Sequence, residues 1–315
     1  MARSVVVAVL TAPALWQRAS LSMVAACVMK AGAAGVHCAV DDWARVQTSH
    51  SFTGRMCAAS RWEESRRGDS LFVDRLAYKL AGAEGRPHPM GAWMMVPRTR
   101  FGDDILRKAY SAREPHPCRQ LVLLGAGMDA RAWRMELPEL DVFEVDQQTT
   151  FDVKEPLVAT ERLGVRSRTV VASEFTDPGQ WAVDLEARGF RRDVPSVWLL
   201  EGLMMYLNMD DSRSLMRDVG RMSAPGSVVF HDAISASYVQ QRINVAGAPF
   251  LGGSDDYGGL WAQEAGFGKF FVHDFGSLHV DRSRRRLVVD PRYAEATPER
   301  CAGRNLPLFV VAEKL

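Results

Sequence analysis

The sequence predicts an α/β fold in which helices cover both faces of a doubly wound, mostly parallel sheet of seven strands. After residue 119, short apolar runs alternate with stretches of helix-like spacing. These runs have no polar face, which is typical of parallel strands buried on both sides. Before residue 119 the apolar residues recur at helical spacing, so we expect an N-terminal helical cap over residues 54–118 and the sheet over residues 119–315.

Residues 1–40 differ in composition from the rest of the chain. They contain no Asp or Glu, and their only basic residues are Arg3, Arg18 and Lys30. Such a segment is typical of an organelle-targeting leader, and its apolar run over residues 5–10 is too short to span a bilayer. We expect residues 1–53 to be an N-terminal extension, either a targeting leader or a plain helical or disordered segment. The protein is accordingly expected in the cytoplasm, or in an organelle if the leader directs it there.

Charge and cysteine content exclude several classes of function. The net charge is +1, so no overall field attracts nucleic acid or an anionic membrane, and neither is expected as a partner. The five cysteines are scattered and form no C-x-x-C pair, which predicts neither a disulfide framework nor a metal site. The basic run over residues 282–286 is interpreted as a solvated turn.

The cap is expected to contain two helical stretches. The first runs from Gly54 to Gly82, where glycines and prolines end it. The second runs from about Arg98 to Ala112, before two further prolines. Seven strands then follow in order, at Leu121–Leu124, Asp141–Asp146, Thr169–Ala172, Ser196–Leu200, Ser227–His231, Lys269–His273 and Leu306–Ala312.

The first strand runs directly into a glycine-containing turn. Gly125 permits the sharp turn, and Gly127 lets a ligand approach the backbone closely. Asp146 ends the second strand, where a carboxylate can accept hydrogen bonds from the ribose hydroxyls of an adenosine cofactor. This Rossmann-like arrangement also fits an NAD-dependent oxidoreductase. Asp129 in the turn argues against that alternative, because its carboxylate repels a pyrophosphate and attracts the cationic sulfonium of S-adenosylmethionine.

Four ordered segments carry a family resemblance: residues 98–104 (RTRFGDD), 120–135 (QLVLLGAGMDARAWRM), 143–146 (FEVD) and 198–206 (WLLEGLMMY). Together they resemble the leucine carboxyl methyltransferase family, which also contains bacterial carboxyl- and O-methyltransferases that act on small molecules. The resemblance covers about residues 54–315. It implies a class I methyltransferase fold with S-adenosylmethionine as the cofactor.

The resemblance also implies roles for individual residues. Arg100 matches the arginine that holds the cofactor carboxylate, with Arg98 and Arg61 as basic neighbours. Glu174 and Phe175 fall beside the adenine, where the family usually has Asp-Leu, so the longer Glu174 is a departure. The other cofactor-binding residues implied are Gly125, Gly127, Asp129, Asp146 and Glu201, and the expected catalytic residues are Glu201, Tyr206 and His231.

The methyl acceptor is left open between several alternatives. A carboxylate is ionised at neutral pH and needs no general base, whereas a hydroxyl needs one. His231, at the end of the fifth strand, is the candidate base, although a histidine bonded into a loop explains it equally well. We expect carboxyl or hydroxyl methylation of a small molecule, with the C-terminal leucine of a protein as the alternative acceptor.

Overall fold

The computed structural model describes residues 49–82, 87, 91–113, 117–175, 179–245, 247–289 and 295–315. The chain divides into two compact units, residues 1–46 and 47–315, and the described residues all belong to the second. The expected targeting leader in residues 1–40 lies outside them. Within the described ranges, no helix has the length and apolar character needed to cross a membrane.

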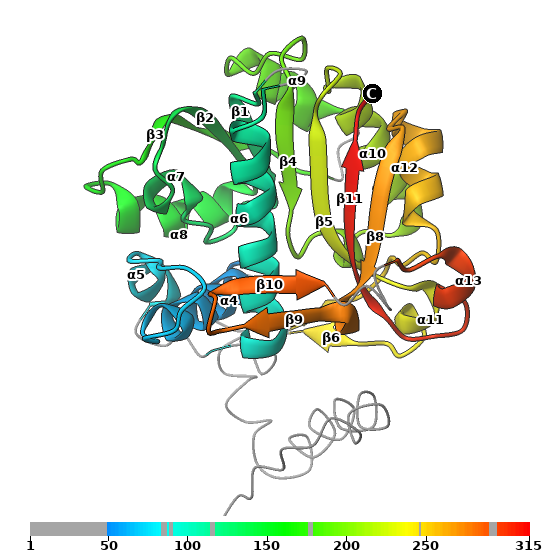
Figure 1. The fold of residues 1–315 in the computed structure, drawn as a ribbon. Helices are drawn as coiled ribbons and strands as arrows, with labels where there is room; N and C mark the ends of the chain where they lie inside the picture. Colours follow the sequence, from blue (N-terminus) through cyan, green and yellow to red (C-terminus); the bar gives the residue numbers. More distant parts are fainter. Residues whose placement is uncertain are drawn as a thin grey trace, which may run out of the picture. The chain divides into compact units, whose positions relative to one another are not determined.

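Seven strands form one sheet in the order β3-β2-β1-β4-β5-β11-β8 (Figure 1). All of them are parallel except β11, which runs antiparallel to both of its neighbours. The predicted fold class is therefore confirmed, and each predicted strand is present within a few residues of its expected bounds. The strands are β1 (Gln120–Leu124), β2 (Leu137–Asp146), β3 (Val165–Ala172), β4 (Ser196–Leu200), β5 (Val228–Ile234), β8 (Lys269–Asp274) and β11 (Pro307–Glu313).

Helices bury an apolar core on each face of this sheet. On one face α6 (Val96–Tyr110) and α7 (Arg131–Arg134) pack over Leu121, Leu123 and their neighbours. On the other face α9 (Gln180–Ala187), α10 (Met209–Arg221) and α12 (Tyr257–Ala265) pack over side chains such as Trp198 and Leu200. Successive strand residues point to opposite faces, which explains why both core sets alternate along β1 and β4.

The helical cap differs from its prediction in one respect. The first helix, α4, spans Ser49–Ser65, and a separate short helix, α5, spans Ala77–Ala81. Two side chains at the end of α4 bind the backbone of the segment between the helices: Glu64 accepts from Leu71 N (2.7 Å) and Ser65 Oγ accepts from Asp74 N (2.8 Å). These bonds compete with helical ones and hold that segment out of the helix. A π-helical turn (η1, Gly91–Met95) then leads into α6, and α8 (Gln148–Val158) packs against α4 and α5.

Several short elements complete the fold around the sheet and the helical cap. The hairpin of β9 (Leu278–Asp281) and β10 (Arg286–Val289) crosses α6 beside α4, as Figure 1 shows. The turn of this hairpin contains the basic run over residues 282–286, which we interpreted from the sequence as a solvated turn. The remaining elements are η2 (Met204–Tyr206), α11 (Ala236–Val239), β6 (Asn244–Val245), β7 (Ala248–Pro249), η3 (Phe275–Ser277) and α13 (Pro298–Cys301).

Candidate functional site

The glycine turn lies at the carboxyl end of β1, next to the point where the strand order reverses. Gly125 and Gly127 both have left-handed backbones, with φ of 71° and 47°. Gly125 N and Ala126 N donate to Val145 O of β2 at 2.9 and 3.2 Å, which fixes the turn across two strands. A Cβ on Gly127 would have no atom nearer than 3.9 Å. The turn therefore presents an unobstructed backbone where ligands bind in open α/β sheets.

Asp146 is held directly beneath this turn. Its Oδ2 accepts from Gly127 N and its Oδ1 accepts from Gln147 N, each at 2.7 Å. Burial raises the pKa of this carboxyl. The next strand end lies alongside, because Gln147 Nε2 donates to Glu174 Oε2 at 2.9 Å, and the ring of Phe175 packs against Trp181. The structure thus brings the glycine turn and the predicted ribose and adenine residues together along one edge.

Glu201, directly after β4, meets two buried arginines. Its Oε1 accepts from Arg131 Nη2 at 2.5 Å, and its Oε2 lies 3.4 Å from Arg98 Nε. Burial raises the pKa of Glu201, while the charges of Arg131 and Arg98 act against that rise. Asp129 of the glycine turn belongs to the same cluster, because its two oxygens accept from the backbone and side chain of Arg131.

The two predicted arginines of α6 have different surroundings. Arg98 is 6% exposed and donates from Nη1 to Asp232 Oδ2 at 2.8 Å. Its Nε is buried and forms no hydrogen bond within the described part of the chain. Arg100 instead contacts Asp104, Leu71 O and Arg285 O at 2.6–2.9 Å. The structure therefore places Arg98, not Arg100, beside Glu201.

Arg61 supports the glycine turn from α4. Its Nε pairs with Asp74 Oδ2 at 2.8 Å, and its Nη2 donates to Met128 O within the turn. Arg61 is 7% exposed and Asp74 is fully buried. These hydrogen bonds make Arg61 a support of the loop backbone.

Tyr206 and His231 have different packing partners. Tyr206 belongs to η2, where its ring packs against Phe250 and burial raises its pKa. His231 is fully buried on the α12 face of β5; its Nε2 accepts from Trp261 Nε1 at 2.9 Å and its Nδ1 lies 3.3 Å from Asp232 O. Burial lowers the pKa of His231 to about 4. Both ring nitrogens are engaged in the core, so the structure does not place His231 as an accessible base.

Three residues of this cluster were not singled out by the sequence. Arg131 and Asp103 stand within the segments that carry the family resemblance, so these motifs were the available signal. Cys57 of α4 has its Sγ 3.5 Å from Arg98 Nη2 and 3.4 Å from Met95 Sδ. Nothing in the sequence around Cys57 pointed to this neighbourhood.

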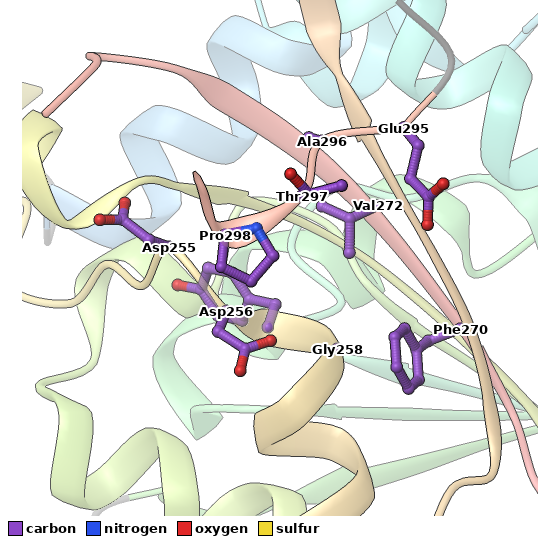
Figure 2. A pocket seen from close by; sticks show the side chains of 10 residues that line it. Asp255, Asp256, Gly258, Phe270, Val272, Glu295, Ala296, Thr297 and Pro298 are labelled. Atoms are coloured by element: carbon purple, nitrogen blue, oxygen red, sulfur yellow. The ribbon is translucent and has the colours of Figure 1, made fainter. Parts of the chain in front are cut away.

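A separate small pocket lies between α12, β8 and the segment 295–298 (Figure 2). Carboxylates of Asp255, Asp256 and Glu295 and the ring of Phe270 line it. Asp256 caps α12 through Gly259 N at 2.7 Å, and Asp255 accepts from Ala236 N at 3.0 Å. None of the predicted site residues lines this pocket, and two of its carboxylates have structural partners.

The chain is similar in sequence to known proteins. The family model described as leucine carboxyl methyltransferase matches residues 54–220. A provisionally named S-adenosyl-L-methionine-dependent methyltransferase of Parafrankia sp. (strain EAN1pec) is 35% identical over 232 residues, 66% of this chain and 71% of the relative. One of the same description from Streptomyces avermitilis is 36% identical over 205 residues, 59% of this chain and 70% of the relative.

Two solved structures share the fold at low sequence identity. A provisionally named methyltransferase from Thermobifida fusca has a TM-score of 0.52 and 17% identity, over 82% of this chain and 94% of that one. A DUF574 family protein from Streptomyces avermitilis has a TM-score of 0.50 and 14% identity, over 82% of this chain and 97% of that one. At such identity these likenesses concern the fold.

Proposed function

The chain belongs to the leucine carboxyl methyltransferase family, and from that membership we propose that this S-adenosylmethionine-dependent methyltransferase methylates an oxygen of a small molecule, with a carboxylate as the preferred acceptor. Membership of this family also decides against the NAD-dependent alternative.

The residues at the strand ends fit the proposed cofactor. The glycine turn and Asp146 suit the ribose, Glu174 and Phe175 suit the adenine, and Glu201 with Arg98 suits the amino acid end. The buried Nε of Arg98 lies 3.4 Å from Glu201 Oε2 without forming a hydrogen bond within the described ranges, and this supports the fit because a buried donor gains from a well-placed acceptor. Bound there, the cofactor supplies a methyl group on a sulfonium that is already a good leaving group.

What remains for the protein is mainly alignment and the exclusion of water. Holding two reactants in line lowers the activation free energy by about 7–11 kcal/mol in favourable cases. The glycine turn is tied to β2 and to Asp146, and Glu201 is tied to two arginines, so the predicted site residues are rigidly supported. Rigid support is what such a positioning mechanism requires.

The surroundings of His231 carry the preference for a carboxylate. Its Nε2 accepts from Trp261 and its Nδ1 faces a carbonyl, so its lone pair is already bound. Tyr206 has a raised pKa and therefore stays protonated at neutral pH, able to donate a hydrogen bond but not to accept a proton as a base. A carboxylate acceptor needs no base. A carboxylate on a small molecule and the C-terminal carboxylate of a protein are alike in this respect, because neither needs a base.

The test is the pH dependence of kcat with an acceptor found in a panel of small carboxylic acids, phenols and a peptide ending in leucine. We expect kcat to be constant from pH 6 to 8 and His231→Gln to retain it within about threefold. A loss of about 10²–10⁴-fold in His231→Gln, together with an acid limb of the wild type that disappears in the variant, would assign hydroxyl methylation with His231 as the base. Binding of S-adenosylhomocysteine checks that the variant is folded. Methylation of the peptide alone would identify a protein tail as the acceptor.

A further inference from the structure

One arginine connects three separate parts of the candidate site. Arg131, at the start of α7, is 1% exposed. It contacts both carboxylate oxygens of Asp129 in the glycine turn and Glu201 Oε1 after β4. On its other side it donates to Asp103 Oδ1 at 2.9 Å and to Thr99 O at 3.1 Å, both in α6. The carboxylates of the turn and of the fourth strand are therefore joined through a single buried guanidinium.

Gly102 of α6 makes this contact sterically possible. A Cβ at this position would lie 2.5 Å from Glu201 Oε1 and 2.8 Å from Arg131 Nη2, the two atoms that form the bond. Both are the far ends of flexible side chains, so an added methyl group displaces these ends without a clash with the backbone. The backbone of Gly102 is helical, and alanine is the better helix former. A glycine here serves the contact and not the helix.

We propose that Arg131 is a positioning residue that keeps Glu201 and Asp129 ionised and aimed at the amino acid end of the cofactor, with Gly102 providing the space. We call Arg131, Asp129, Glu201 and Gly102 the arginine clamp. This proposal rests on the proposed cofactor site. The family resemblance gave Arg131 and Gly102 no role, and it gave Asp129 and Glu201 a role only as residues that bind the cofactor themselves.

The charges around Glu201 explain why such a clamp is needed. Four charged side chains influence it: Arg131 and Arg98 favour its ionised form, while Asp129 and Asp232 disfavour it together with burial. Burial also opposes ionisation of Asp129, but the charges of Arg131, Arg134, Arg61 and Lys154 together outweigh it and hold the pKa of that carboxyl well below its usual range. A cation between two neighbouring, partly buried carboxylates favours the charged form of both. Ionised, both attract the cationic amino group of the cofactor.

The neighbouring Arg134 offers a matched control. It belongs to the same short helix, is buried, and pairs with both oxygens of Asp103 at 2.6 and 2.7 Å. Its Nη1 also contacts Met135 Sδ at 3.7 Å, and within the described ranges none of its hydrogen bonds reaches Asp129 or Glu201. Arg134→Met removes a buried cation from the same helix but leaves the clamp in place.

The experiment measures the dissociation constant of S-adenosylhomocysteine at pH 6 and pH 8 by calorimetry, with 5′-methylthioadenosine, which lacks the amino acid end, as the second ligand. Without the charge of Arg131 the pKa of Glu201 should rise, so Glu201 becomes partly protonated at pH 6. In Arg131→Met we therefore expect the dissociation constant at pH 6, divided by that at pH 8, to be about 5- to 50-fold larger than in wild type. A change of this size corresponds to the uptake of at most one proton. We expect Arg131→Lys and Arg134→Met to keep the wild-type ratio. Adding Glu201→Gln to Arg131→Met should remove the added pH dependence, because glutamine does not titrate.

Gly102→Ala tests the same contact without removing a charge. We expect it to weaken S-adenosylhomocysteine about 3- to 30-fold, to leave 5′-methylthioadenosine unchanged and to keep or raise the melting temperature. The clamp is overturned if Gly102→Ala binds as wild type, or if folded Arg131→Met keeps the wild-type pH ratio. If Arg131→Met does not fold, Gly102→Ala decides. Failure of the wild type to bind S-adenosylhomocysteine would instead overturn the proposed cofactor site.

Discussion

Arg98 and Arg100 show how two neighbouring residues of one type acquire different roles. They stand two positions apart on α6, so their side chains leave the helix about 200° apart. Arg98 consequently points to Asp232 and Glu201, while Arg100 points to Leu71 O and Arg285 O. Gly202 helps, since a Cβ there would lie 3.1 Å from Arg98 Nη1. The motif predicted a carboxylate-binding arginine, and the position of the helix selects Arg98 as the candidate.

Arg98→Lys should weaken the binding of S-adenosylhomocysteine about 10- to 100-fold, the scale of one hydrogen bond to a charged group at 1.5–3 kcal/mol. Lysine keeps a positive charge beside Asp232, which limits the damage to the fold. Binding of 5′-methylthioadenosine should change little, because it has no carboxylate. Calorimetry with both ligands measures this, with Arg100→Lys as the control that affects neither. Equal losses for both ligands in Arg98→Lys would show a structural role.

His231 should make the stability depend on pH. Burial lowers its pKa to about 4 in the folded state, below the ordinary value of 6.5. The unfolded chain therefore binds a proton that the folded chain does not, so this contribution is present above pH 6.5 and is lost as the pH falls toward 4. We expect a loss of up to about 1.4 kcal/mol per pH unit from this group. Urea unfolding between pH 4.5 and 7 should show a shallower decline in His231→Gln; an unchanged slope would mean that His231 is protonated in the folded protein.

At the scale of elements, the β9–β10 hairpin is fastened to the helical cap. Arg282 pairs with both oxygens of Glu64 at 2.9 and 3.1 Å, and Arg285 donates to Gly68 O at 2.8 Å. Arg100 reaches the hairpin from α6 through Arg285 O. The basic run thus makes specific contacts with segments 185–218 residues away in the chain. Charge density in the sequence carried no information about these partners.

Arg282→Gln should lower the free energy of unfolding by about 1–3 kcal/mol. Glu64 is 3% exposed and would keep the Leu71 N–H and a longer pairing with Arg67 at 3.9 Å, which leaves a buried carboxylate poorly satisfied. Urea unfolding at pH 7 measures the change. Arg284→Gln, at an exposed pair with Asp281, is the matched control and should change stability by less than about 0.5 kcal/mol. Equal effects of the two substitutions would show that the hairpin is not fastened through Glu64.

For the whole molecule, the described residues form one compact unit that contains the sheet, the cap and every predicted site residue. Deleting residues 1–40 should therefore leave a folded protein that binds S-adenosylhomocysteine with wild-type affinity. Circular dichroism and calorimetry on the truncated chain test this. Precipitation, or a loss of affinity above about threefold, would place these residues in the core or over the site.

The sequence by itself determined the sheet, the cofactor turn and the family. Strands buried on both faces read as continuous apolar runs, and β4 occupies the predicted residues Ser196–Leu200. Gly125 and Gly127 indicated the turn because few other residues adopt a left-handed backbone. These features depend on neighbours along the chain, so a linear pattern is enough to predict them.

Tertiary structure alone decided which charged side chains meet. Residues 102, 129, 131 and 201 converge because α6 packs against β4 and β5. The same packing places Arg98 at Glu201, turns His231 into the core beside Trp261, and orients Arg100 toward the hairpin. Such pairings join residues far apart in the chain, and their geometry follows from helix rotation and strand alternation. The family motifs identified the segments, and packing determined the role available to each residue.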